Sequence, residues 1–161
     1  MKALLTITTC NQLSYTKLCD QSLPDLKNID ILYVDDASID GTADYLDSKN
    51  RDTIYKKSGV GLTDSWNIAY RRFKDLNYDA LFISNNDVIL NEPSIINMLD
   101  VLNEYTLVCP LTSRKGAGHN HLYQDVNKYY KIPNKIDCNP DKHNDILNIL
   151  ENNIVEMDQF N

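Results

Sequence analysis

The most informative segment of this 161-residue chain is Val34-Asp35-Asp36-Ala37-Ser38-Ile39-Asp40-Gly41-Thr42. It joins an apolar segment at 29–34 to an amphipathic segment at 42–48, which predicts a buried strand, a tight turn and a helix. Two carboxylates directly after a strand can accept hydrogen bonds from N–H or hydroxyl groups of a ligand. We therefore interpret Asp36 as a ligand-binding residue and the run from Asp40 to Thr42 as a turn with a helix cap.

Outward from this stretch, strand-like apolar segments alternate with amphipathic helical segments, which predicts an α/β fold with a mostly parallel central sheet flanked by helices. The predicted strands are 3–9, 29–34, 53–56, 80–84 and 106–109. The predicted helices are 15–21, 42–48, 62–76 and 93–104. In the third helix apolar residues recur at helical spacing, so we expect Trp66 to lie in the core. Beyond Pro110 we expect a polar loop, irregular structure and one late helix at 141–151.

Composition limits the class of protein. The length fits a single domain over 1–161, and 42% apolar with 24% charged residues is a globular balance. A net charge of −7 argues against a nucleic-acid partner. The four cysteines form no C-x-x-C pair, so we expect reduced thiols. With no signal peptide after Met1 and no run of about 18 apolar residues, we expect a cytoplasmic protein without a membrane span.

Polar clusters follow three of the predicted strands. They are Thr8-Thr9-Cys10-Asn11, Asp35-Asp36 and Asn85-Asn86-Asp87. In an open α/β sheet, ligands bind beyond the carboxyl ends of the strands. We therefore expect the three clusters to meet at one edge of the sheet and to form a site.

Two further segments can contribute to this site. Asp87 can supply a charged oxygen ligand to Mn²⁺ or Mg²⁺ and its two preceding asparagines neutral oxygens, although Asn-Asn-Asp also favours turns. The backbone of Ser58-Gly59-Val60-Gly61 can approach a ligand closely, and the following helix N-terminus favours anions. His119 and His121 either lend an imidazole to the cation or are simply solvated.

With these residues in hand, the chain resembles the family 2 glycosyltransferases of the Rossmann-like GT-A fold, from about Ala3 to Val108. The run 34–42 is similar to the family's V-D-D-G-S-x-D-G-T and departs from it only at Ala37. The first strand resembles one that ends in P-T-Y-N, with Cys10 in place of the tyrosine. Gly59-Val60-Gly61 and 65–69 resemble the N-x-G loop and the A-R-N-x-G helix. Asn85-Asn86-Asp87 stands where the family has its D-x-D, in a form seen among members that transfer rhamnose-like sugars.

The resemblance implies a role for each matching residue. Thr8 and Asp36 would contact the nucleoside, with Asp36 on the N3–H of uracil or thymine, and Asp87 would bind the cation at the diphosphate. The other nucleotide-sugar-binding residues expected are Thr9, Asn11, Asp35, Ser38, Gly59, Asn67, Asn85 and Asn86. The implied reaction is inverting, metal-dependent transfer from a UDP-sugar or dTDP-sugar to a glycan or protein acceptor by single displacement.

The resemblance also implies a catalytic base in an E-D motif, which the chain does not match. Glu151, Glu156 and Asp158 fall in a tail that fits no such motif, so no catalytic residue is assigned. We expect a nucleotide-sugar-binding core at 1–110 and, at 111–161, a loop and tail with an incomplete acceptor side, as in a truncated chain. The richness in Lys, Asn, Tyr and Ile suits a glycosyltransferase of a large DNA virus such as a chlorovirus. Such an enzyme would act in the host cytoplasm.

Two other functions compete with this interpretation. A chain without the base segment can be a module that binds donor without transferring sugar. A nucleotidyltransferase shares the sheet and the need for metal, but it requires a glycine-rich signature with a basic residue after the first strand. This chain has Thr9-Cys10-Asn11-Gln12 there, so the nucleotidyltransferase ranks last.

Overall fold

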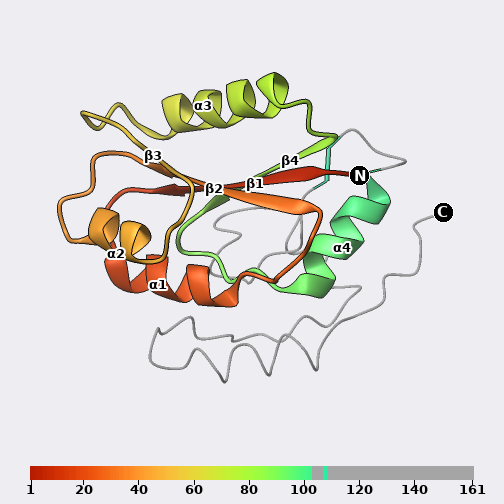
Figure 1. Cartoon of the computed structure of the whole chain (residues 1–161), viewed down its shortest axis with the longest axis horizontal. Helices are drawn as coiled ribbons and strands as arrows, with labels where there is room; N and C mark the ends of the chain where they lie inside the picture. Colours follow the sequence, from red (N-terminus) through yellow and green to blue (C-terminus); the bar gives the residue numbers. More distant parts are fainter. Residues whose placement is uncertain (103–106, 109–161) are drawn as a thin grey trace, which may run out of the picture. The chain divides into compact units, whose positions relative to one another are not determined.

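The computed structural model describes residues 1–102 and 107–108, and within them it shows four strands and four helices in alternation (Figure 1). The strands are β1 Ala3–Thr9, β2 Ile29–Asp35, β3 Thr53–Tyr55 and β4 Ala80–Asn85. The helices are α1 Leu13–Ser22, α2 Thr42–Ser48, α3 Leu62–Asp75 and α4 Glu92–Val101. These elements match the first four predicted strands and all four main helices, with small differences at their ends. Leu107 and Val108 lie in no strand, and the rest of the chain after 102, including the predicted loop and late helix, falls outside the described residues.

The sheet is parallel throughout its described strands, in the order β3-β2-β1-β4. β1 is central, and all seven of its residues are buried because strands flank both edges and helices cover both faces. The chain steps from β1 outward to β3 and then crosses to β4 on the other side of β1. The strand order therefore reverses between β1 and β4, which is where open α/β sheets bind ligands.

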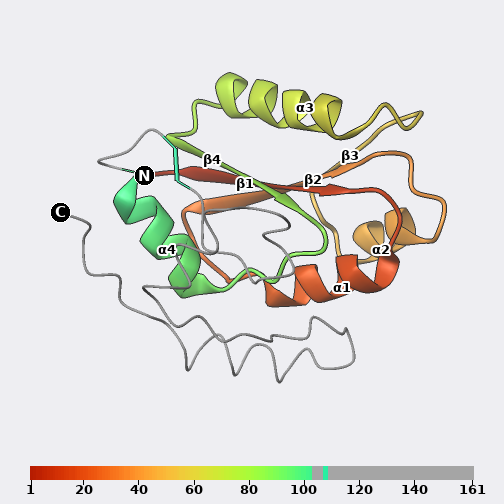
Figure 2. The same cartoon turned by 180° about the vertical axis from the view of Figure 1, so that it is seen from behind.

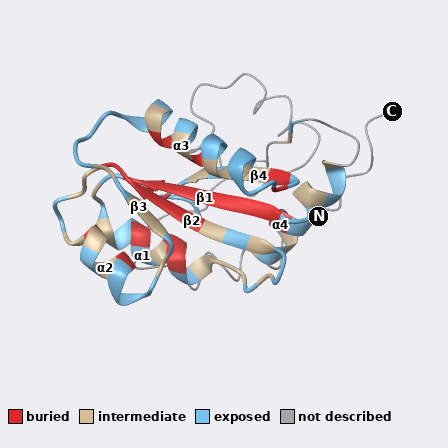
Figure 3. Cartoon of the chain, turned by 45° about the horizontal axis from the view of Figure 1, so that its top comes forward, coloured by how far each residue is buried: buried red, intermediate tan, exposed pale blue. Residues whose placement is uncertain are grey.

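Helices cover the two faces of the sheet unequally. α3 lies on one face, whereas α1, α2 and α4 lie on the other (Figures 1 and 2). Because side chains alternate along a strand, Leu4 packs with Ile68 and Phe73 of α3, whereas Leu5 packs with Leu46 of α2 and Ile95 of α4. Figure 3 shows that buried residues are concentrated in β1 and in the second half of β2. None of the helices within residues 1–102 is long and apolar enough to cross a membrane.

The prediction that Trp66 lies in the core was wrong, because its side chain is 40% exposed. α3 instead turns the small residues Ser65 and Ala69 toward the sheet, and both are buried. Small side chains allow a helix to lie close to a sheet, and this orientation moves the residue after Ser65 about 100° around the helix. The large apolar side chains at positions 62, 66 and 70 are all exposed as a result.

A buried carboxylate, Asp20 of α1, connects three segments on the more heavily covered face. Its oxygens accept hydrogen bonds from Tyr33 Oη of β2 and Tyr45 Oη of α2, both at 2.8 Å. Asp20 also forms an ion pair with Arg51 Nε at 2.7 Å. Burial, and then the hydrogen bond to Asp20, raise the pKa of Tyr45 to about 12. Burial, and then the hydrogen bond to Asp20, also raise the pKa of Tyr33, so both hydroxyls stay protonated and donate to Asp20 at neutral pH.

The turn after β2 contains a residue in an unfavourable backbone conformation. Ala37 has a φ of 58°, in the left-handed region where glycine is favoured. The motif that this turn resembles has glycine at the same position. The Cβ atom of an L-residue costs free energy in this region, so Ala37 is strained where glycine would not be.

We expect Asp20→Asn to lower the free energy of unfolding by about 3 kcal/mol, because it leaves Arg51 without its buried counter-charge and puts an amide N–H donor where one carboxylate oxygen accepted a tyrosine hydroxyl. Urea unfolding followed by circular dichroism measures this change. Tyr45→Phe removes only one hydrogen bond and should cost about 1 kcal/mol. Equal stability of Asp20→Asn and wild type would contradict the role of Asp20.

We expect Ala37→Gly to raise the free energy of unfolding by about 0.5–1 kcal/mol, since relief of the left-handed strain outweighs the entropy that glycine gains in the unfolded chain. Ala43→Gly, within α2, is the matched control and should lower stability by about 1 kcal/mol. The same unfolding experiment reports both variants, and a loss of stability in Ala37→Gly would refute the strain at that position.

Candidate functional site

The structure brings the three polar clusters together at the carboxyl edge of the sheet. Thr9 Oγ1 at the end of β1 donates to Asp35 Oδ1 at the end of β2, at 2.8 Å. On the other side of β1, Thr8 Oγ1 lies 3.1 Å from Asn85 Oδ1 of β4. Parallel pairing places Thr9 beside Asp35 and Thr8 beside Asn85, so the strand register itself produces these contacts.

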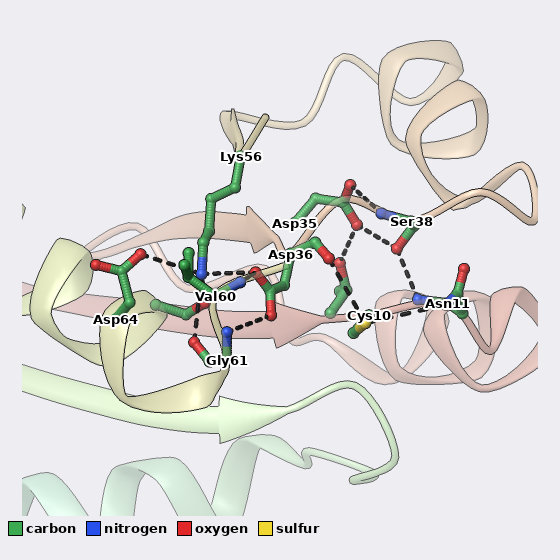
Figure 4. Close-up of polar contacts among 11 residues, drawn as sticks. Cys10, Asn11, Asp35, Asp36, Ser38, Lys56, Val60, Gly61 and Asp64 are labelled. Atoms are coloured by element: carbon green, nitrogen blue, oxygen red, sulfur yellow. Dashed lines mark hydrogen bonds and ion pairs between the residues drawn. The ribbon is translucent and has the colours of Figure 1, made fainter. Parts of the chain in front are cut away.

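Asp35 and Ser38 hold the turn after β2. Asp35 is buried, and its carboxylate accepts hydrogen bonds from Thr9 Oγ1, from Ser38 Oγ and, at 3.1 Å, from Ser38 N (Figure 4). Ser38 Oγ in turn accepts a hydrogen bond of 2.6 Å from Asn11 N. Both oxygens of Asp35 therefore accept hydrogen bonds from the protein itself. Its side chain stabilises the turn that borders the site.

Asn11 links the three strand ends. Its side-chain Oδ1 accepts from Ile39 N at 2.8 Å, and its carbonyl accepts from Asn86 Nδ2 at 3.1 Å. Asn11 and Gln12 both have left-handed backbones, with φ of 60° and 62°. Asparagine tolerates this conformation better than most residues, so the sharp turn into α1 fits the sequence at this point.

The Asn85-Asn86-Asp87 segment divides into an inner and an outer part. Asn86 is buried, and its amide donates to Thr16 Oγ1 at 2.9 Å as well as to the Asn11 carbonyl. Asn85 is exposed beside Thr8, and Asp87 is exposed in the turn that follows β4. Among the described residues, nothing makes a hydrogen bond or ion pair with the Asp87 carboxylate, which is therefore open to solvent.

Asp36 is the most heavily bonded carboxylate on the α3 side of the edge (Figure 4). Its Oδ1 accepts from Lys56 Nζ at 2.6 Å and from Val60 N at 3.0 Å, and its Oδ2 accepts from Gly61 N at 2.9 Å. Burial acts to raise the pKa of Asp36, but these hydrogen bonds outweigh it and hold the pKa below its ordinary value. The carboxylate is thus ionised at neutral pH.

Lys56 follows the edge strand β3 and is fixed on several sides. It forms a second ion pair with Asp64 Oδ2 at 3.1 Å and donates to Ser65 Oγ at 3.2 Å. Only 6% of its side chain is exposed, against 11% for Asp36. Burial acts to lower the pKa of Lys56, but the two carboxylates raise it above its ordinary value, so the ammonium keeps its charge. Sequence reasoning missed Lys56 because it assigned this residue to the strand 53–56 and not to the polar positions that follow a strand.

The glycine-containing loop 58–61 folds against Asp36. A Cβ atom at Gly59 would lie 3.6 Å from the Asp36 carbonyl oxygen and 3.9 Å from Oδ2. We expected the N-terminus of α3 to attract an anion, and the anion that the structure places there is Asp36 itself, bonded to Gly61 N. Asn67 lies exposed on α3, and among the described residues its side chain makes no hydrogen bond with any other predicted site residue.

The two described cysteines differ in environment. Cys10, at the end of β1, is exposed, and its Sγ lies 3.6 Å from the Asp36 carbonyl oxygen. Cys19 is buried in α1, and burial, followed by the nearby charges of Asp20 and Asp87, raises the pKa of its thiol to about 12. Cys10 therefore belongs to the surface of the site, whereas Cys19 is a core residue.

The residues that could hold a cation are few. The described residues contain no group of three or more His, Cys, Asp or Glu side chains placed to bind a metal. His119 and His121 lie outside the described residues. What the edge offers is the Asp87 carboxylate with the nearby Asn85 amide oxygen. This donor set fits a cation that takes most of its ligands from phosphate oxygens and water, as Mg²⁺ commonly does, and does not fit one held by the protein alone.

Solved structures similar to this chain include TarS from S. aureus. TarS 1–349, both alone and in complex with UDP, aligns with a TM-score of 0.54 at 18% identity over 66% of this chain and 33% of TarS. A second TarS structure gives a TM-score of 0.52 at 17% identity over 65% of this chain and 20% of that one. The chain thus spans a third or less of these proteins, and at such identities the likeness shows the fold alone. It confirms the Rossmann-like GT-A fold.

A search of curated proteins gave no match. The family model described as glycosyl transferase family 2 matches residues 6–152, which is more than half of the chain and includes every described residue of the site. The resemblance seen in the strand ends and turns is thereby confirmed, and the chain belongs to glycosyl transferase family 2.

Proposed function

We propose that the carboxyl edge of the sheet binds a nucleoside-diphosphate sugar and that the chain supplies the donor side of an inverting glycosyltransferase. The observation that carries the proposal is the pair of carboxylates on this edge. Asp36 is ionised and held in place by Lys56 and two backbone N–H groups, and Asp87 is ionisable, exposed and unbonded within the described residues. Asp36 is suited to accept a hydrogen bond from a nucleoside, and Asp87 is suited to bind a cation at a diphosphate.

The nucleoside lies, in this proposal, between Asp36, the Gly59 loop and Thr8. Asp36 accepts the N3–H of uracil or thymine, and the close backbone of the loop forms one wall. TarS has been solved with UDP, which supports a uridine nucleotide for this chain too. Asp35, Ser38, Asn11 and Asn86 act as positioning residues, since their side chains are bonded to other parts of the edge.

The diphosphate lies near Asp87 together with Mn²⁺ or Mg²⁺. The cation would neutralise the charge that develops on the departing nucleoside diphosphate. Asp87 would be the charged ligand of the cation and Asn85 would support the ribose or the cation, whereas Asn86 fixes the turn through Asn11 and Thr16. The Asn-Asn-Asp form further supports a rhamnose-like donor sugar.

The reaction proposed is a single displacement. A hydroxyl of a glycan or protein acceptor attacks the anomeric carbon on the face opposite the diphosphate, its proton passes to a general base, and the bond to the diphosphate oxygen breaks. The described residues supply donor binding and leaving-group stabilisation. The base and the acceptor side are not assigned to any of them.

We expect Asp87→Ala to weaken Mn²⁺-dependent binding of UDP by about tenfold or more, because the cation loses its charged protein ligand. Calorimetric titration of UDP with and without Mn²⁺ measures the effect, and the metal-free affinity should stay unchanged. Mn²⁺ alone should bind too weakly to detect, since most of its ligands come from the diphosphate.

Asp25→Ala is the matched control, because Asp25 is an exposed carboxylate in the segment before β2, away from the carboxyl ends of the strands. It should leave both affinities unchanged. If Asp87→Ala behaves like Asp25→Ala, the cation is not bound at Asp87. If UDP, dTDP and GDP all fail to bind the wild type, the proposed function is wrong.

A further inference from the structure

We propose that Lys56 is a specificity-determining residue that restricts the donor to uracil or thymine, whose ring N3–H has no amino group beside it, by occupying one oxygen of Asp36. The inference rests on the proposed function, in which Asp36 accepts a hydrogen bond from the base. It goes beyond that function by assigning the choice of base to a buried residue that does not contact the ligand.

Asp36 has a limited capacity to accept hydrogen bonds. A carboxylate offers about four acceptor positions, two on each oxygen. Oδ1 already accepts from Lys56 Nζ and Val60 N, and Oδ2 accepts from Gly61 N. Three of the four positions are therefore filled by the protein, and the remaining position is on Oδ2.

One free position discriminates between bases. Uracil and thymine present one ring donor, N3–H, between two carbonyl groups, which a single acceptor satisfies. Guanine presents N1–H beside an exocyclic amino group, and these two parallel donors pair with both oxygens of a carboxylate. At Asp36 as it is held here, a bound guanine would keep one donor unpaired, which costs free energy in a desolvated site.

Further contacts hold Lys56 in its position on Oδ1. Its ammonium is also bonded to Asp64 Oδ2, to Ser65 Oγ and to the Gly61 carbonyl at 3.3 Å, so it is anchored to the first turn of α3 and the residue before it. Its side chain is almost fully buried, which leaves no surface for a phosphate. Lys56 therefore acts through Asp36 and is a positioning residue.

Gly59 keeps the free oxygen accessible. A Cβ atom there would lie 3.9 Å from Asp36 Oδ2, so a larger side chain would add atoms close to that oxygen. The backbone of Gly59 is not in the left-handed region, unlike that of Gly61, whose φ is 93°. A larger residue at 59 thus adds atoms next to Oδ2 without the left-handed strain that it would meet at 61.

The experiment is calorimetric titration of the full chain with UDP, dTDP, GDP and 3-methyl-UDP, which lacks the N3–H. For the wild type we expect UDP and dTDP to bind at least about tenfold more tightly than GDP and 3-methyl-UDP, the effect of one unpaired buried donor or acceptor. In Lys56→Met, each oxygen of Asp36 has one free acceptor position. The affinity for GDP should therefore rise relative to that for UDP, until the two affinities differ by no more than about threefold. Lys57→Met removes a neighbouring exposed lysine and should keep the wild-type ratio.

Gly59→Val keeps the proposal testable if Lys56→Met does not fold. It should weaken UDP binding by about tenfold or more while leaving the circular dichroism spectrum unchanged. Unchanged UDP affinity in Gly59→Val, equal binding of UDP and 3-methyl-UDP by the wild type, or a wild-type UDP-to-GDP ratio in folded Lys56→Met would each overturn the inference while leaving nucleotide binding intact. Failure of the wild type to bind any of the four nucleotides would instead overturn the proposed function, and this inference with it.

Discussion

The parallel pairing of β1 with β2 on one side and with β4 on the other is the constraint on which the whole site depends. Because every described strand runs in the same direction, all polar residues that follow the strands come to one edge. The backbone ladder continues past the strand ends, where Asp36 N donates to the Thr9 carbonyl and Asn86 N donates to the Thr8 carbonyl. Residues about 75 positions apart in the sequence are thereby held within hydrogen-bond distance.

The same geometry gives two adjacent carboxylates different roles. Successive side chains of a strand point to opposite faces, so Asp35 and Asp36 separate at the end of β2. Asp35 turns to the face that carries α1 and α2, where Ser38 and Thr9 bond it. Asp36 continues on the face that carries α3 and meets Lys56 and the loop before that helix. Asp35 is therefore buried and stabilises the turn, whereas Asp36 is a partly accessible hydrogen-bond acceptor.

Much of this could be predicted from the sequence, because hydrophobic periodicity and turn residues are local signals. The four described strands, the helices and the three polar clusters at one edge followed from them. The face that α3 buries did not follow, since the close packing of Ser65 and Ala69 decides it and apolar spacing favoured Trp66. The partners of Asp36 were also out of reach, because Val60 and Gly61 lie 24 and 25 residues away along the chain. The function was predicted from a motif that resembles a known family. Hydrophobic periodicity gives information about strands and helices, not about function.

The buried ion pair between Lys56 and Asp36 has a consequence for how such proteins diverge. A residue that sets the acceptor pattern of a binding carboxylate, while staying out of contact with the ligand, can be exchanged in evolution without any change in the contact residues themselves. Two homologues with identical ligand-lining residues can then differ in the nucleotide they use. Comparisons confined to the lining residues would group them together, and the informative position would be the one behind the carboxylate.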